Sequence, residues 1–205
     1  MKNVWMKLIV VAQGVILLAA CAGNGQIASP EQRVERGGKM PGMVKEGELY
    51  EFDKKRGLHR FVGLAYDVKA LDTGQDVAEA DAMSRLVQAV NQEARREVLR
   101  SVSGPEREEV GRFYSKTFAG ISSAMPVSGA ASRRVYWERY VREEFGQPRD
   151  FYRVWIIVEI PDEDFRRAKA QLLTEMARQA RIRNDARAEA LSLGALERLM
   201  TERTR

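Results

Sequence analysis

Residues 151–160 read Phe-Tyr-Arg-Val-Trp-Ile-Ile-Val-Glu-Ile, and this stretch decides the fold. β-Branched and aromatic residues dominate it, which is typical of β-strands. Alternate positions form one largely apolar face: Tyr152, Val154, Ile156, Val158 and Ile160. Phe151, Trp155 and Ile157 make the opposite face partly apolar as well. A strand with two apolar faces is covered on both sides, so the pattern predicts a central strand of a sheet.

Two further strands are predicted on the N-terminal side of this stretch. Residues 134–142 alternate in the same way, and residues 145–148, Phe-Gly-Gln-Pro, supply a turn between the two strands. So short a connection favours an antiparallel hairpin. Residues 61–68 also alternate, and Gly63 and Ala65 on one face leave space for a helix to approach the strand.

Two amphipathic helices accompany the strands. Asp76 is expected to begin an Ala-rich helix that runs to about Val102, where Ser-Gly-Pro at 103–105 ends it. Pro161 stops the central strand, and three acidic residues at 162–164 suit the start of a long C-terminal helix. The predicted fold class is therefore α+β, with an antiparallel sheet of three to four strands packed against an Ala-rich helix and a long C-terminal helix.

The end of the C-terminal helix leaves two alternatives. Its first apolar stripe ends near Ala180, a charged stretch follows at 181–187, and a second apolar patch covers 191–200. The helix either continues straight and protrudes, or breaks near Asn184 and folds the patch back on the sheet. We favour the straight helix, whose patch would need burial against another molecule. Truncation after Ala180 would then leave the core folded and weaken association.

The N-terminal residues have the composition of an export signal. Lys2 and Lys7 precede an apolar run at 8–20, which is shorter than the roughly 20 residues that span a bilayer. The run ends in Leu18-Ala-Ala-Cys21, which resembles the lipobox of bacterial lipoproteins. Small residues let a peptidase approach the backbone, and the sulfur of Cys21 is the nucleophile that takes diacylglycerol. The amine that cleavage frees can then receive a further chain such as palmitate.

The next segment is predicted to be a flexible tether. Residues 22–60 contain seven glycines and two prolines, and no period of a helix or strand persists through them. A short strand or docking element at 48–52 is the one exception, and the sole histidine, His59, is interpreted as a surface residue. The predicted organisation is a signal peptide at 1–20, lipidated Cys21 and tether at 21–60, an α+β domain at 61–180, and a helical extension at 181–205.

The order of these elements resembles a family of small outer-membrane lipoproteins. The family includes the Helicobacter-type surface antigen lipoprotein and a related flagellar outer-membrane lipoprotein. The resemblance covers about residues 61–173 and rests on Ala-Glu-Ala-Asp-Ala at 78–82, Trp137, and residues 152–165. It implies an α+β domain without known chemistry. Asp is absent at position 22, where it would favour the inner membrane, so an outer-membrane anchor facing the periplasm is expected by analogy.

Composition and motifs indicate no enzyme. The formal net charge is +5, or +3 without Lys2 and Lys7, and the export signal argues against a nucleic-acid partner. Neither usual glycine-rich phosphate loop nor a His/Cys cluster for metal is found, so no cofactor and no metal are expected. Cys21 is the only cysteine, so no disulfide is available. Four glutamates are interpreted as solvated strand or turn residues: Glu138, Glu143, Glu144 and Glu159.

Two functions remain open. The leading hypothesis is a structural or assembly lipoprotein of the envelope, held to the membrane by lipid on Cys21, which associates with itself or with an envelope protein. The alternative is a periplasmic lipoprotein that binds a ligand or peptidoglycan. In that case Trp137 or Tyr140 would stack on a sugar ring.

Overall fold

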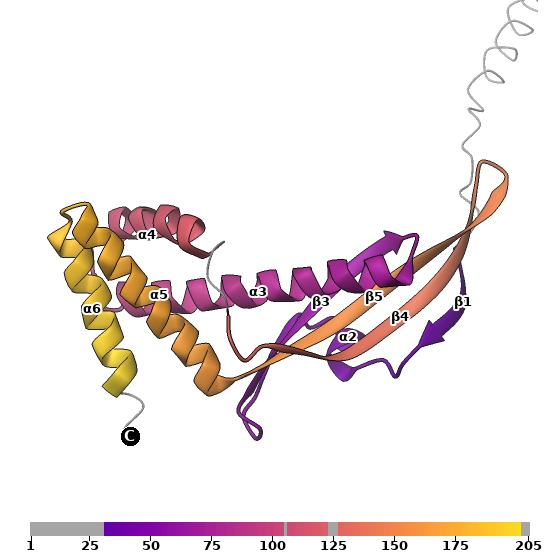
Figure 1. Cartoon of the computed structure of the whole chain (residues 1–205), viewed down its shortest axis with the longest axis horizontal. Helices are drawn as coiled ribbons and strands as arrows, with labels where there is room; N and C mark the ends of the chain where they lie inside the picture. Colours follow the sequence, from indigo (N-terminus) through magenta and orange to yellow (C-terminus); the bar gives the residue numbers. More distant parts are fainter. Residues whose placement is uncertain (1–30, 105, 123–126, 202–205) are drawn as a thin grey trace, which may run out of the picture.

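A computed structural model describes residues 31–104, 106–122 and 127–201 (Figure 1). One antiparallel sheet has the strand order β1-β4-β5-β3-β2. Its five strands are β1 (Gln32–Gly37), β2 (Tyr50–Asp53), β3 (Leu58–Val68), β4 (Ala131–Glu144) and β5 (Gln147–Pro161). The predicted α+β class is confirmed, and β5 occupies the central position expected from its two apolar faces. The sheet is wider than expected because β1 and β2 come from the predicted tether.

Most of the helices cover one face of the sheet or gather at one end of it, and the short helix α2 (Gly42–Glu46) packs on the other face (Figure 1). The others are α3 (Leu71–Leu99), α4 (Glu106–Ser122), α5 (Asp162–Ile182) and α6 (Ala186–Thr201). The Ala-rich helix α3 begins five residues before the predicted Asp76, because its first turn already has core to cover. Gly74 in that turn is buried against Val68 and Val154. Within the described residues, no helix combines the length and apolar character that a membrane span requires.

Helix α3 and strand β3 approach each other closely in the core. A Cβ atom on Gly63 would lie 1.8 Å from the carbonyl oxygen of Ala78 and 2.8 Å from Cβ of Ala82. Ala78 and Ala82 are both completely buried. The space that the sequence predicts beside Gly63 is therefore filled by the backbone of α3.

The β4–β5 hairpin is the longest feature of the sheet. Glu144 pairs with Gln147, so Phe145 and Gly146 form a two-residue turn. Both have positive φ, 54° and 74° respectively. The hairpin predicted at 134–142 and 151–160 is confirmed and extends further at both ends.

The prediction of a flexible tether is wrong for residues 31–60. β1 pairs with β4, β2 pairs with β3, and Met43 of α2 packs on the second face of the sheet against Val62 and Ile157. The apolar period is missing because β1 is exposed along its length and held through its backbone. The short strand predicted at 48–52 corresponds to β2. The folded part thus includes residues before the predicted boundary at 61.

The prediction of one straight C-terminal helix is also wrong. α5 ends at Ile182, Asn184 adopts φ 56°, and the Asp185 amide donates to the carbonyl of Ala180. The chain then reverses, and α6 packs on α5 and α3. The break near Asn184 was the less favoured alternative, and the patch reaches helices rather than the sheet. The hydroxyl of Tyr114 in α4 donates to the carbonyl of Ala188 in α6 at 2.9 Å, which ties the reversed helix into the core.

Substitution of Gly63 by alanine tests the contact between α3 and β3. The added methyl group would meet helix backbone, which cannot move without separating the helix from the sheet. Gly63→Ala is expected to lower the free energy of unfolding by about 3 kcal/mol or more, measured by denaturant titration. Gly42→Ala is the control, because open space surrounds that position and the change should be neutral or slightly stabilising. Equal stability of the two variants would contradict the contact.

A second pair of variants tests whether α6 belongs to the core. Leu199 is 5% exposed, whereas Leu193 on the same helix is 44% exposed. Leu199→Ala is expected to lower the free energy of unfolding by about 2–4 kcal/mol, and Leu193→Ala by less than about 1 kcal/mol. Similar small losses for both would mean that α6 is detached from the domain.

Candidate functional site

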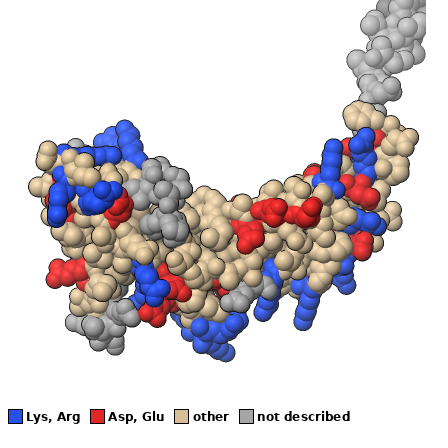
Figure 2. Space-filling view, in the orientation of Figure 1, with Lys and Arg blue, Asp and Glu red and all other residues tan. Residues whose placement is uncertain are grey.

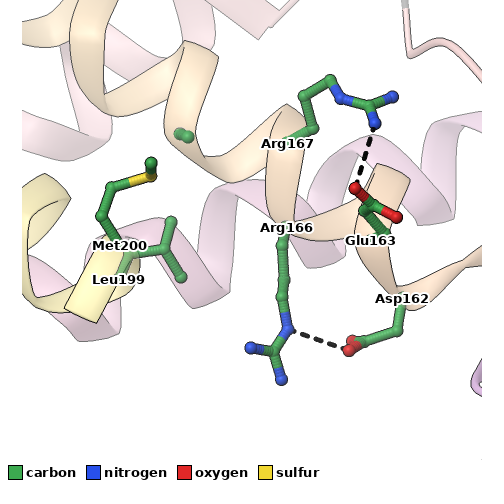
Figure 3. A pocket seen from close by; sticks show the side chains of 7 residues that line it. Asp162, Glu163, Arg166, Arg167, Leu199 and Met200 are labelled. Atoms are coloured by element: carbon green, nitrogen blue, oxygen red, sulfur yellow. Dashed lines mark hydrogen bonds and ion pairs between the residues drawn. The ribbon is translucent and has the colours of Figure 1, made fainter. Parts of the chain in front are cut away.

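A groove lies between the first half of α5 and the end of α6 (Figure 3). Its volume is about 570 Å³. The lining residues are Asp162, Glu163, Arg166, Arg167, Ala170, Leu199 and Met200. Leu199 and Ala170 form the inner part of the apolar wall, and Met200, which is 52% exposed, is the part open to solvent. The groove is suited to an apolar group that enters from outside the fold.

Ion pairs along α5 form the polar side of the groove. Arg166 donates from Nε to the Asp162 carboxylate at 2.9 Å, and Arg167 lies 3.6 Å from Glu163 (Figure 3). Arg167 also donates to Asp164. Because every arginine here has an acidic partner, the groove does not favour an anion. Figure 2 shows the same balance more widely, with basic and acidic side chains interspersed over the visible face.

Asp162 also binds His59, behind the groove. His59 donates from Nε2 to Oδ1 of Asp162 at 2.9 Å, and its Nδ1 accepts from the Tyr50 hydroxyl at 3.0 Å. Its ring stacks between Phe52 and Phe165, with centroids at 4.5 and 4.1 Å. His59 is only 7% exposed, so its interpretation as a surface residue is wrong. The alternating pattern of residues 61–68 indicates this burial. When the pattern is extended towards the N-terminus, residue 59 falls on the face of the strand that the helices cover.

The environment of His59 favours its neutral form. Burial lowers the pKa of the imidazole, and the hydrogen bond to Asp162 only partly opposes this effect. Burial also disfavours ionisation of Asp162, but the hydrogen bonds from His59 and Arg166 outweigh it and hold the pKa of that carboxyl below its usual range. This arrangement attaches the start of α5 to β2 and β3, and so fixes one side of the groove.

A buried carboxylate lies on the opposite face of the sheet. Glu138 is 4% exposed and accepts hydrogen bonds from the hydroxyls of Tyr136 and Tyr140 and from Arg33 at 2.7 Å. Burial disfavours its ionisation, but these three donors keep the pKa of Glu138 lowered. Burial and the bond to Glu138 together raise the pKa of Tyr136 to about 12. The cluster attaches the edge strand β1 to β4.

The four glutamates of the sequence analysis divide into two kinds. Glu138 and Glu159 are buried, so their interpretation as solvated residues is wrong. Glu159 accepts from Nε of Arg60 at 3.0 Å. Glu143 and Glu144 lie near the hairpin turn, as expected for turn residues. Each buried carboxylate accepts a hydrogen bond from an arginine on a neighbouring strand, and Glu138 accepts two more from tyrosines of its own strand, which offsets the cost of removing a charge from water.

The two candidate sugar-stacking residues are occupied within the fold. The indole of Trp137 lies over Gly37, where a Cβ would come within 2.1 Å of its Nε1, and it packs edge-on against Tyr152. The guanidinium of Arg153 covers the ring of Tyr140 at 4.3 Å. These contacts give little support to sugar recognition by either ring.

Some predicted features fall elsewhere. Cys21, the one predicted modification site, and the signal at 1–20 lie outside the described residues. In the part of the chain that the structure describes, no group of three or more His, Cys, Asp or Glu side chains is placed to hold a metal ion.

The contact of His59 with Asp162 predicts a pH dependence of stability. Because the folded state holds the pKa of His59 below its unfolded value, the unfolded chain takes up the proton first as the pH falls. Stability should therefore be highest above about pH 6.5 and decline below it. Since the chain has one histidine, a decline between about pH 7.5 and 5.5 reports mainly on this residue.

Denaturant titrations at several pH values test this expectation. His59→Gln should remove most of the decline, whereas Tyr50→Phe keeps the imidazole and the bond to Asp162 and should retain it. An unchanged pH profile in His59→Gln would show that another group is responsible.

Comparisons of the chain with protein-family models, with curated proteins and with solved structures give no match. The likeness to small outer-membrane lipoproteins therefore stays a prediction from the residues quoted above.

Proposed function

We propose that this protein is a lipid-anchored assembly lipoprotein of the bacterial envelope, which holds a partner protein in the groove between α5 and α6. The observation that carries the proposal is the separation of two ends. The described chain enters the fold beside the β4–β5 hairpin, and the groove lies at the opposite, helical end (Figure 1). A molecule with its membrane attachment at one end and its groove at the other would hold a partner protein at a distance from the membrane.

Attachment of the hairpin end to the membrane depends on lipidation of Cys21. The apolar run at 8–20 and the sequence Leu18-Ala-Ala-Cys21 have the length and residue types of a lipoprotein signal. Several acyl chains on one cysteine would give stable attachment, where a single chain binds only marginally. Nine residues separate Cys21 from Glu31, so the attachment would lie close to the hairpin end.

The groove end supports a protein partner more than a small ligand. Its apolar wall is open at Met200, and Leu193 and Ile182 are further exposed apolar side chains of the α5–α6 pair outside the groove. An amphipathic helix with one or two large apolar side chains matches such an open, ion-pair-lined groove. A second copy of this chain is the special case in which the protein assembles with itself.

Site-specific photocrosslinking in cells tests the groove. A photoreactive residue at Met200 is expected to give one discrete adduct, because that side chain is half exposed at the groove wall. Ala170→Trp, which fills the groove, should abolish the adduct. Thr73 is the control position, because it is exposed on α3, far from the groove. An adduct with twice the mass of the protein would identify self-association.

Equal crosslinking at positions 73 and 200, or none at 200, would contradict a partner in the groove. The anchor is tested separately by mass spectrometry of the mature N-terminus. Cys21→Ser should leave an unprocessed and unlipidated precursor, because a hydroxyl is a much poorer nucleophile than a thiolate. A wild-type chain without lipid on Cys21 would contradict the anchor.

A further inference from the structure

We infer that the tip of the β4–β5 hairpin, with Phe145 at its apex, rests on the phospholipid surface to which the protein is anchored. This inference extends the proposed function, because it rests on lipidation of Cys21. It adds a second membrane contact and an orientation for the domain.

Phe145 has no role in the fold. Its side chain is 98% exposed, and it occupies the first position of a two-residue turn. Both turn residues have positive φ, the conformation that Asn-Gly favours in hairpins. Gly146 fits this rule and phenylalanine does not. A large aromatic side chain that the turn disfavours and the core does not contact is therefore explained better by something outside the domain.

The tip and the anchor lie at the same end of the molecule. β1 begins with Gln32 opposite Val141, four residues before Phe145, and it runs away from the tip. Glu31 is paired with Arg153 and lies 3.6 Å from Arg142, so the entering chain is fixed to the hairpin.

The short stretch of sequence between Cys21 and Glu31 limits how far this end can lie from the membrane. The ten residue steps from Cys21 to Glu31 span at most about 35 Å when fully extended. The hairpin end must therefore stay close to the bilayer surface, while the groove lies at the far end of the domain (Figure 1).

The chemistry of the tip fits an uncharged contact. Arg142 is paired with Asp67 at 3.5 Å and with Glu144 at 2.8 Å, and Arg139 lies 3.4 Å from Glu35. Arg149, opposite Arg142, is exposed, but Glu143 and Asp150 lie beside it in the hairpin, so the tip carries balanced charge rather than a basic patch for anionic lipid. Insertion of the aromatic ring at the headgroup boundary is the contact that remains. One ring binds weakly by itself, but an anchor nearby raises its effective concentration to the millimolar range.

Fluorescence of the lipidated full-length protein in vesicles tests the inference. The vesicles contain phosphatidylcholine with brominated acyl chains, which quench a tryptophan only at close range. The emission that Phe145→Trp adds to the parent spectrum should be blue-shifted and strongly quenched. Lys55→Trp is the matched control, because Lys55 is exposed in the β2–β3 turn away from the hairpin tip. Quenching should be the same when a third of the lipid is phosphatidylglycerol.

Equal quenching at positions 55 and 145 would overturn the inference, and so would quenching at 145 that requires anionic lipid. Phe145→Asn gives a second measurement. It should unfold at an equal or higher denaturant concentration than the parent protein, since asparagine suits the turn. On vesicles, the slow hydrogen exchange expected for residues 143–148 of the parent should become fast in this variant.

Absence of lipid on Cys21 can be distinguished experimentally from absence of a membrane contact at the hairpin tip. If mass spectrometry finds no lipid on Cys21, the proposed function fails, but the free thiol of this single cysteine can be coupled to a maleimide-bearing lipid. The quenching comparison then tests the tip on a chemically anchored chain. Loss of quenching at 145 under that condition would overturn the inference by itself.

Discussion

The close approach of α3 to β3 at Gly63 is the constraint on which the rest of the structure depends. Helix backbone occupies the place of a side chain there, so α3 can lie along the sheet only in one position. α5 follows β5 directly and is held beside α3, and α6 then closes over both. The helices accumulate at one end, while the β4–β5 hairpin extends at the other (Figure 1). The two-ended form of the molecule results from this packing.

Buried polar groups attach the edges of this core. His59 and Asp162 join the start of α5 to the strands, and Arg33 of β1 binds Glu138 of β4, which also accepts from two tyrosines of β4. A buried charge without partners would destabilise the fold, whereas here each carboxylate is satisfied by several donors. The same contacts position the two ends to which we assign functions: Asp162 contributes to the groove, and β1 leads back to the anchor.

The sequence predicts best what local pattern encodes. Residues 151–160, the turn at Phe145-Gly146 and the space at Gly63 are all visible from alternation and residue size. β1 was missed because an exposed edge strand pairs through its backbone and needs no apolar pattern. Local sequence is compatible both with a straight helix and with a break at Asn184, since the hydrogen bond of Tyr114 to Ala188 that holds α6 joins residues 74 positions apart.

The candidate sites likewise differ in whether neighbouring residues or residues far apart in the sequence form them. Cys21 can be recognised from four adjacent residues, whereas the bond between His59 and Asp162 spans 103 positions and has no local signature.

The orientation of the domain on the membrane is the central claim, and energy transfer measures it most directly. A lipidated Cys21 leaves no other thiol, so a single introduced cysteine can carry a donor dye. With acceptor dyes on the lipid headgroups, a donor at Gln32→Cys should transfer its energy efficiently, and a donor at Met200→Cys should transfer much less. Equal transfer from the two positions would mean that the domain lies flat or inverted, and would contradict this account.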